Sequence, residues 1–286
     1  MIAALAFLPA MDAIAKLLSR HLPIVEIVWA RYLFYALAVV PLAHWRHGRA
    51  VVRPARPALQ LLRAALMAMS ALMFFSAIAR MPLADAMAVF FIYPILILLA
   101  SNLLLRETIG YARWAIVALG FTGATLAAKP SFIGISPGIP YALTSSCAYA
   151  GALLVTRRLT PYDPSLVTAA ISAIFGVLAY SLAVPFVWIL PAPRDWPLMA
   201  VMGGIAAIGH FLIVVAHRMT TASRLAPYGY IEIVAAVFFG FVIFRDWPTS
   251  PVWIGVVLIV ASGIAASLRE ERSIQKRHAP EPASTK

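Results

Sequence analysis

The sequence predicts an all-α integral membrane protein with ten transmembrane helices, arranged as two five-helix repeats of inverted topology. Composition is the first observation behind this prediction. Hydrophobic residues make up 63% of the 286 residues and charged residues only 12%, whereas soluble domains carry about 25% charged residues. The second is that the apolar residues form successive runs, close to the roughly 20 residues that a helix needs to cross a bilayer. An internal repeat is the third.

Ten apolar runs follow one another along the chain, separated by short segments that contain proline and charged residues. Their expected ranges are 2–18, 23–45, 58–79, 86–105, 111–128, 138–156, 165–190, 198–217, 225–244 and 251–268. Prolines mark the breaks because they interrupt regular structure. No segment between the runs is long enough to form a soluble domain. The tail, 269–286, is charged and contains proline, so we expect disorder beyond about residue 275.

The stretch between Arg80 and Trp114 occurs a second time, about half the chain later. The matching residues are Arg80, Met81, Arg106, Glu107 and Trp114 in the first copy, and Arg218, Met219, Arg245, Asp246 and Trp253 in the second. Five apolar runs fit within the offset between the copies. Because five is odd, the second copy must cross the membrane in the opposite sense, as in secondary transporters built from inverted repeats. The predicted repeats span 1–129 and 138–268.

The distribution of lysine and arginine predicts the orientation of the chain. Alternate loops together with the tail hold 15 of these residues, and the loops on the opposite side hold 5. Cytoplasmic loops of membrane proteins carry the excess of positive charge. We therefore expect both termini in the cytoplasm, which also requires an even number of spans.

Several function classes are excluded by what the sequence lacks. A single cysteine, Cys147, rules out an intramolecular disulfide and any multi-cysteine metal site. The chain has no phosphate-binding loop for an ATP-driven pump, and no HExxH motif for a metal-dependent hydrolase. The net charge of +12 comes from basic residues scattered over short loops, so we do not expect nucleic-acid binding. Neither an enzyme nor a bound cofactor or metal is expected.

Three ionisable residues near the membrane midplane form the first candidate site. Asp12 and Lys16 are four residues apart on the first run and share a helix face. At 1.5 Å per residue, Asp12 lies roughly 15 Å from the outer boundary and Arg31 roughly 12 Å. The two helices are joined by a short turn, so the three side chains can meet at one level. They form either a substrate site, in which the Arg31 fork suits a carboxylate, or a structural ion network.

Two further titratable residues lie inside apolar runs. Glu232 is the eighth residue of the ninth run and has no opposite charge near it in sequence. It either couples transport to protons, binds a substrate amine, or is a buried protonated carboxyl with a structural hydrogen bond. Its position matches Pro94 in the first repeat, which we expect to kink the fourth helix. His210 lies within the eighth run, where a lone histidine is more often structural than part of a relay.

Aromatic residues with polar tips are candidates for the lining of a cavity. They are Trp29, Tyr32, Tyr93, Tyr149, Tyr228 and Tyr230. Because tyrosine and tryptophan also gather at membrane interfaces, the interface explains Trp29 and Tyr228 better. The cavity is favoured for Tyr93 and Tyr149.

Two charged pairs end the fourth and ninth runs, on opposite faces of the membrane. They are Arg106 with Glu107 and Arg245 with Asp246. Their equivalence across an inverted repeat predicts symmetric gating, and an interface salt bridge of small energetic value is the simpler alternative.

These residues together resemble the drug/metabolite transporter superfamily, specifically two tandem EamA-type domains over about residues 1–270. The similar residues are Asp12 to Lys16 with Glu26 and Arg31, Pro94 with Leu105 to Glu107, Glu232, Phe244 to Pro248, and Leu258 to Gly263. The chain departs from the usual pattern at Asp246, where Glu is common, and at Arg106, where a Gly often precedes the Glu. The resemblance implies a bacterial inner-membrane carrier of small metabolites without a cofactor, often an exporter of amino acids or drugs.

The leading hypothesis is a secondary transporter that exports amino acids by alternating access around a site between the halves. Some members that the first run resembles import S-adenosylmethionine, so uptake of such a metabolite is the alternative. A non-transporting membrane enzyme or scaffold is a third. The expected partners are a small-molecule substrate and the lipid bilayer, with proton coupling through Glu232 and a monomeric or homodimeric state both open.

The orientation gives a first testable prediction. In a Cys147→Ala background, a Ser131→Cys variant should react with a membrane-impermeant thiol reagent applied to intact cells, because the charge distribution places that loop outside. The tail variant Ser273→Cys should react only after the cells are permeabilised. The opposite labelling pattern would contradict cytoplasmic termini.

Overall fold

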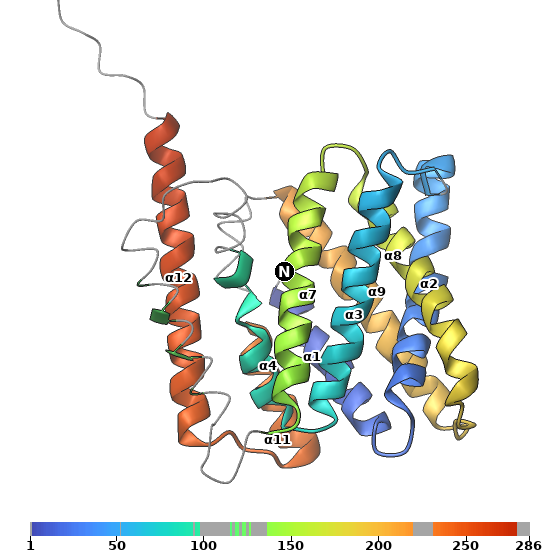
Figure 1. Cartoon of the computed structure of the whole chain (residues 1–286), viewed down its shortest axis with the longest axis horizontal. Helices are drawn as coiled ribbons and strands as arrows, with labels where there is room; N and C mark the ends of the chain where they lie inside the picture. Colours follow the sequence, from blue (N-terminus) through green and yellow to red (C-terminus); the bar gives the residue numbers. More distant parts are fainter. Residues whose placement is uncertain are drawn as a thin grey trace, which may run out of the picture.

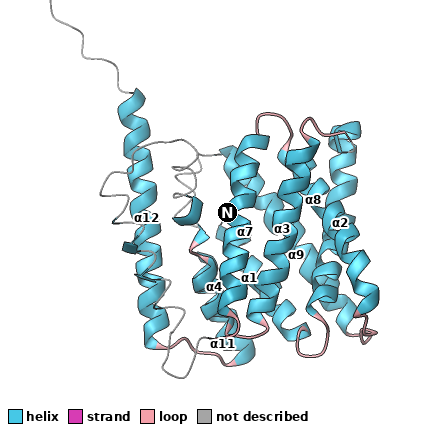
Figure 2. Cartoon of the chain, in the orientation of Figure 1, coloured by secondary structure: helices cyan, strands magenta, loops and turns pink. Residues whose placement is uncertain are grey.

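The computed structural model describes residues 2–51, 53–93, 95–97, 136–219 and 231–278, and positions 115, 118, 119, 122, 123 and 126. Every secondary-structure element in these ranges is helical (Figure 2). Five of the described helices are long and apolar enough to cross a membrane. The predicted all-α membrane class agrees with this finding. The number ten and the inverted topology stay predictions, because most of the fifth run lies outside the described residues.

The first half of the chain forms four described helices, and three of them begin at or next to a proline. They are α1 (Ile2–Leu18), α2 (Ile24–His47), α3 (Pro57–Ile78) and α4 (Leu83–Phe90), with a short 3-10 helix at Gly48–Val51. Pro23 and Pro82 are the N-caps of α2 and α4, and Pro57 opens α3. Proline suits such positions because its fixed φ fits the first turn and its missing N–H would have no partner there. Pro94 lies outside the described residues.

The second half forms five described helices, which Figure 1 shows in green to red. They are α7 (Ile139–Leu159), α8 (Ser165–Ala183), α9 (Asp195–Met219), α11 (Ile231–Phe244) and α12 (Ser250–His278). Two predicted boundaries are wrong here. The seventh run was expected to stay helical to residue 190, but α8 ends at Ala183 and a 3-10 turn, Val184–Phe186, follows. Pro185 explains this end, since a proline cannot donate the next helical hydrogen bond.

The second wrong boundary is the end of the tenth run. The tail was expected to leave the helix at 268 and to be disordered beyond about residue 275, yet α12 continues to His278. Residues 269–278 contain no glycine or proline and are mostly charged residues with good helix propensity. The helix therefore extends beyond its apolar part.

Helices of the two halves pack against each other in a pattern that is unchanged when the halves are exchanged. The exchange matches α1, α2, α3 and α4 with α7, α8, α9 and α11. Helix α1 packs on α9, and the equivalent pair, α7 and α3, is also in contact. Helix α2 packs on α9, and the equivalent pair is α8 with α3. Helix α1 packs on α11, and the equivalent pair is α7 with α4. The pairs α2 with α8 and α4 with α11 map onto themselves. This arrangement supports two structurally related halves.

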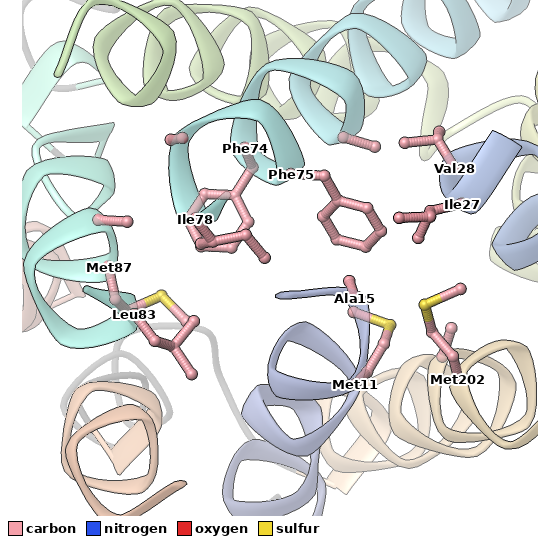
Figure 3. Packing of buried hydrophobic residues seen from close by; sticks show 14 of the residues in the cluster. Met11, Ala15, Ile27, Val28, Phe74, Phe75, Ile78, Leu83, Met87 and Met202 are labelled. Carbon is pink, nitrogen blue, oxygen red and sulfur yellow. The ribbon is translucent and has the colours of Figure 1, made fainter. Parts of the chain in front are cut away.

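A buried apolar core joins α1 to its neighbours. Figure 3 shows side chains from α1, α2, α3, α4 and α9 that point toward a common interior. Its labelled members are Met11, Ala15, Ile27, Val28, Phe74, Phe75, Ile78, Leu83, Met87 and Met202. On the outside, large apolar side chains are exposed, such as Phe186 at 87% and Leu182 at 76%. An apolar exterior around a packed interior is what a bilayer requires.

Helices α2 and α9 approach closely at Gly203. A Cβ atom at this position would lie 2.4 Å from Cβ of Phe34 and 2.9 Å from the backbone nitrogen of Tyr35. The neighbouring Gly204 has no atom within 4 Å of the corresponding position. The two adjacent glycines of α9 therefore differ in their need for a missing side chain.

We expect Gly203→Ala to destabilise the protein by about 1–3 kcal/mol, because the added methyl group would collide with the backbone of α2. Gly204→Ala is the matched control. It should be neutral or stabilise by up to about 1 kcal/mol, since alanine favours a helix over glycine. Thermal unfolding of both purified variants in detergent measures the difference. Equal midpoints would contradict the close packing of α2 on α9.

Candidate functional site

Arg31 on α2 and Asp12 on α1 lie in the interior of the bundle. Asp12 is 6% exposed and interacts electrostatically with Arg31. The guanidinium carbon of Arg31 lies 5.4 Å from the centre of the Tyr32 ring and 5.6 Å from that of Phe75, within the range of cation–π attraction. Among the described residues, no carboxylate forms an ion pair with Arg31. The field of Asp12 thus reaches Arg31 without direct contact between the two charges.

Glu232 adds a second acid from the other half of the chain. It lies in the first turn of α11 and is half-buried. Its charge interacts with Asp12 on α1 and with Tyr149 on α7. Helix α11 packs directly on α1. The acid that looked isolated in the sequence therefore belongs to a group of polar residues contributed by both halves.

Tyr93 and Tyr149 meet, as expected for residues that line one space. Their ring centres are 4.9 Å apart at 87°, an edge-to-face arrangement that aromatic pairs prefer. Phe90 of α4 lies 5.3 Å from Tyr93 and 5.2 Å from Tyr149. This cluster covers the side of the polar group that faces α4 and α7.

Two more aromatic pairs cover the side formed by α2. Tyr32 stacks on Tyr180 of α8 with ring centres 5.9 Å apart, and the Tyr180 hydroxyl donates to the Ala68 carbonyl oxygen at 2.7 Å. One turn further along α2, Tyr35 lies 5.5 Å from the ring of His210. Sequence analysis did not select Tyr35 or Tyr180. In the sequence alone, each of these tyrosines could equally face lipid or the membrane interface. Only the packing of α8 and α9 on α2 shows that they face the interior.

Two predicted site residues have local structural roles. Nδ1 of His210 is 2.7 Å from the Ala206 carbonyl oxygen one turn earlier in α9. The Trp29 indole N–H donates to the hydroxyl of Ser181 at 2.9 Å, and its ring packs edge-on against Trp188, 5.9 Å away. Trp29 therefore belongs to the contact between α2 and the end of α8.

Lys16 is bound at a different place from Arg31. Its ammonium donates to Oδ2 of Asp246 at 2.9 Å and to the Met81 carbonyl oxygen at 3.1 Å. The Phe244 ring lies 4.7 Å from the Lys16 nitrogen. Lys16 was expected to meet Asp12 and Arg31 at one level, but the structure instead joins it to the segment after α11.

The turn that presents Asp246 to Lys16 has an unusual backbone. Arg245 has a φ of 60°, the left-handed conformation, which is rare for a residue other than glycine. The N–H groups of Arg245 and Asp246 donate to the carbonyl oxygens of Phe241 and Gly240, which folds the chain back over the end of α11. The other predicted gating pair, Arg106 and Glu107, lies outside the described residues, as do Tyr228 and Tyr230.

Polar contacts between the halves occur at both ends of the bundle. On the side of Lys16, His21 lies 3.1 Å from a carboxylate oxygen of Asp195. At the opposite end, Gln60 donates to Asp163 at 2.9 Å, and the Ala55 amide donates to the same carboxylate at 3.0 Å. The central polar group thus lies between two sets of contacts that each join the first half to the second.

Comparison with known proteins gives this arrangement its family. The profile of the EamA-like transporter family matches residues 1–128 and again residues 136–268. This chain belongs to that family. The resemblance to the drug/metabolite transporter superfamily that the sequence motifs predicted is thereby confirmed. One solved crystal structure superposes on this EamA-like transporter with a TM-score of 0.68 at 18% identity, covering 95% of this chain and 96% of the other, which shows a shared fold.

Relatives of this EamA-like transporter are named for different small molecules. A pseudopaline exporter of Pseudomonas aeruginosa is 31% identical over 262 residues, 90% of each chain. An S-adenosylmethionine uptake transporter of Rickettsia conorii is 23% identical over 267 residues, covering 93% of this chain and 90% of that one. A riboflavin transporter of Rhizobium johnstonii is 26% identical over 232 residues, covering 81% and 77%. The EamA-like chain is thus a multi-pass membrane protein of a bacterial transporter family.

The ion pair at the end of α11 gives a test of the gating hypothesis in this EamA-like transporter. Reversing one charge, as Lys16→Asp or Asp246→Lys, places like charges together, so we expect transport to fall at least about tenfold. The double reversal restores an attractive pair and should recover most of the rate. Uptake of substrate into proteoliposomes measures all three variants. A double variant as inactive as either single one would contradict a role for the pair.

Proposed function

We propose that this transporter carries a small metabolite with both a carboxylate and an amine through a central site, by alternating access. The observation that carries the proposal is Arg31: a permanently charged guanidinium in the interior, with no ion pair to a described carboxylate. Its planar fork matches a carboxylate in a bidentate arrangement. An amino acid is the simplest molecule that brings such a group.

The acids supply the complementary half of the site. Asp12 and Glu232 interact electrostatically with each other, so a substrate ammonium between them would relieve their mutual repulsion. Tyr149 lies within electrostatic range of Glu232 and of Arg31, and with Tyr93 it offers apolar ring surface to the substrate carbon chain. The site therefore provides a place for each part of an amino acid.

The arrangement of the halves supports the mechanism. Their contact pattern is unchanged on exchange of α1, α2, α3 and α4 with α7, α8, α9 and α11, which is what an inverted repeat would give if both halves rock around one site. We propose that both termini lie in the cytoplasm, that the membrane is the bacterial inner membrane, and that the pair Lys16 with Asp246 closes the outer end in the conformation described.

The substrate remains a choice between two related classes. Amino-acid export is the leading proposal, and uptake of an amino-acid derivative is favoured by the relative named for S-adenosylmethionine. Both fit a site with one carboxylate-binding cation. A thermal-shift screen of purified protein separates them, because a ligand that binds only the folded state stabilises it by mass action. Measurable flux in proteoliposomes would distinguish either from a non-transporting enzyme or scaffold.

Arg31→Ala tests the proposed role of the guanidinium. If Asp12 were its permanent partner, the variant would leave a buried charge unpaired and lose about 3–5 kcal/mol of stability. The lack of an ion pair predicts the opposite: the variant should keep most of its thermal stability and lose the ligand-induced shift with carboxylate substrates. Their amides or esters should be affected much less.

Arg80→Ala is the matched control for this experiment. Arg80 lies after the end of α3, where it donates to the Ser76 carbonyl oxygen at 2.7 Å and covers the Tyr141 ring. This variant removes an arginine outside the central site and should retain the ligand-induced shift. A folded Arg31→Ala protein that transports carboxylate substrates at the wild-type rate would refute the proposed function.

A further inference from the structure

Arg63 is a second cation in the interior, held in place by three neutral oxygens. It is the seventh residue of α3, roughly 9 Å along the helix from its first residue. Its Nε donates to Oγ1 of Thr156 on α7 at 2.7 Å. Its Nη1 donates to Oγ of Ser172 and, at 3.3 Å, to the carbonyl oxygen of Thr168, both on α8. Three helices therefore fix the orientation of this guanidinium.

These contacts do not use all the hydrogen-bond donors of Arg63. A guanidinium has five N–H donors, and Nη2, which carries two of them, donates to no acceptor among the described residues. Within the same part of the chain, no carboxylate forms an ion pair with Arg63. Among the described residues, the titratable groups near its charge are Tyr32, Tyr35, Tyr149 and His210. Charged groups at this depth pair with one another or with backbone carbonyls, and the described residues supply Arg63 with one carbonyl and two hydroxyl oxygens but no anion.

The two interior cations border one tyrosine-lined region. The guanidinium carbon of Arg31 lies 5.4 Å from the centre of the Tyr32 ring. That ring packs against Gly176 of α8, one turn after the Ser172 hydroxyl that binds Arg63. Arg31 is the eighth residue of α2, and Arg63 the seventh of α3. Helices α2 and α3 follow each other in the chain and run in opposite directions, so they begin at opposite ends of the bundle. Arg31 therefore lies nearer one end and Arg63 nearer the other. The cations therefore face the shared region from different levels.

We propose that Arg63 is a second anion-binding residue of the transport site, and that the preferred substrate carries a second anionic group besides the carboxylate bound by Arg31. This inference rests on the proposed function, since it places Arg63 in the same site. One carboxylate cannot occupy two cations at different levels, whereas a molecule with two anionic groups separated by a carbon chain can. Dicarboxylic amino acids and larger amino-acid dicarboxylates form this substrate class.

Matched pairs of acids and amides test the proposal. Aspartate with asparagine, and glutamate with glutamine, have nearly the same shape and differ by one negative charge. Competition against transport in proteoliposomes measures the affinity of each member. We expect at least one acid to bind roughly tenfold or more tightly than its amide, the scale of a hydrogen bond between charged groups. Arg63→Gln should lower this ratio to about one and leave the affinity for the amide unchanged.

Two further variants separate binding from structure. Arg63→Lys keeps the charge but loses the fork, so it should retain an intermediate ratio. Arg56→Gln is the matched control: Arg56 is the exposed N-cap of the same helix, with its guanidinium carbon 4.7 Å from the centre of the Tyr162 ring, and its loss should leave the ratio unchanged. A purely structural Arg63 predicts that Arg63→Gln lowers the unfolding temperature at a constant ratio.

The outcomes distinguish this proposal from the one on which it rests. Equal affinity of the wild-type protein for acid and amide would overturn the assignment of Arg63 while leaving an amino-acid site intact. A wild-type ratio in folded Arg63→Gln, or in Arg63→Lys if the first variant does not fold, would overturn it too. If no member of any pair competes, the amino-acid substrate class itself fails, and the role of Arg63 fails with it.

Discussion

The cost of holding fixed charges within a bilayer governs how this protein is built. Arg31 and Arg63 cannot lose their protons, so each must find partners inside the bundle. Tyrosines, hydroxyl groups and backbone oxygens supply most of them; Asp12 of α1 lies near Arg31, and Glu232 of α11 lies near Asp12. These groups come from α1, α2, α3, α7, α8 and α11, so only the assembled bundle can shelter them. The polar centre therefore depends on both halves.

The packing between the halves shelters that centre and is compatible with the proposed rocking motion. Each helix of the first half has its main contacts with helices of the second. The apolar contacts in Figure 3 are non-directional and can tolerate a small change of angle, whereas the ion pairs and hydrogen bonds at the two ends cannot. A rocking motion would leave the core largely in contact and exchange only the few polar contacts at each end. In such a motion, the polar contacts that change at the two ends would be separate from the apolar core that stabilises the fold.

Much of the fold was predictable because apolar run length and proline position are local properties of the sequence. The starts of α2, α3 and α8 at Pro23, Pro57 and Pro164 are examples. The length of α12 was missed because charge was taken as a sign of disorder. The partner of Lys16, Asp246, lies 230 residues away in the sequence, and no local sequence pattern predicts an ion pair between such distant residues. Arg63 was not selected as a site residue for a similar reason: its position near a helix end favours a path to water, and α7 and α8, which close that path, are distant in sequence.

The left-handed turn at Arg245 has a consequence for the energy balance of the contact between Lys16 and Asp246. A non-glycine residue in this conformation costs about 1–2 kcal/mol, which is similar to or larger than the gain from a partly exposed ion pair. The turn can relax when Asp246 leaves Lys16, so part of the energy lost with the pair returns as relief of backbone strain. If the pair opens during transport, as proposed, this relief offsets part of the cost of separating the two charges.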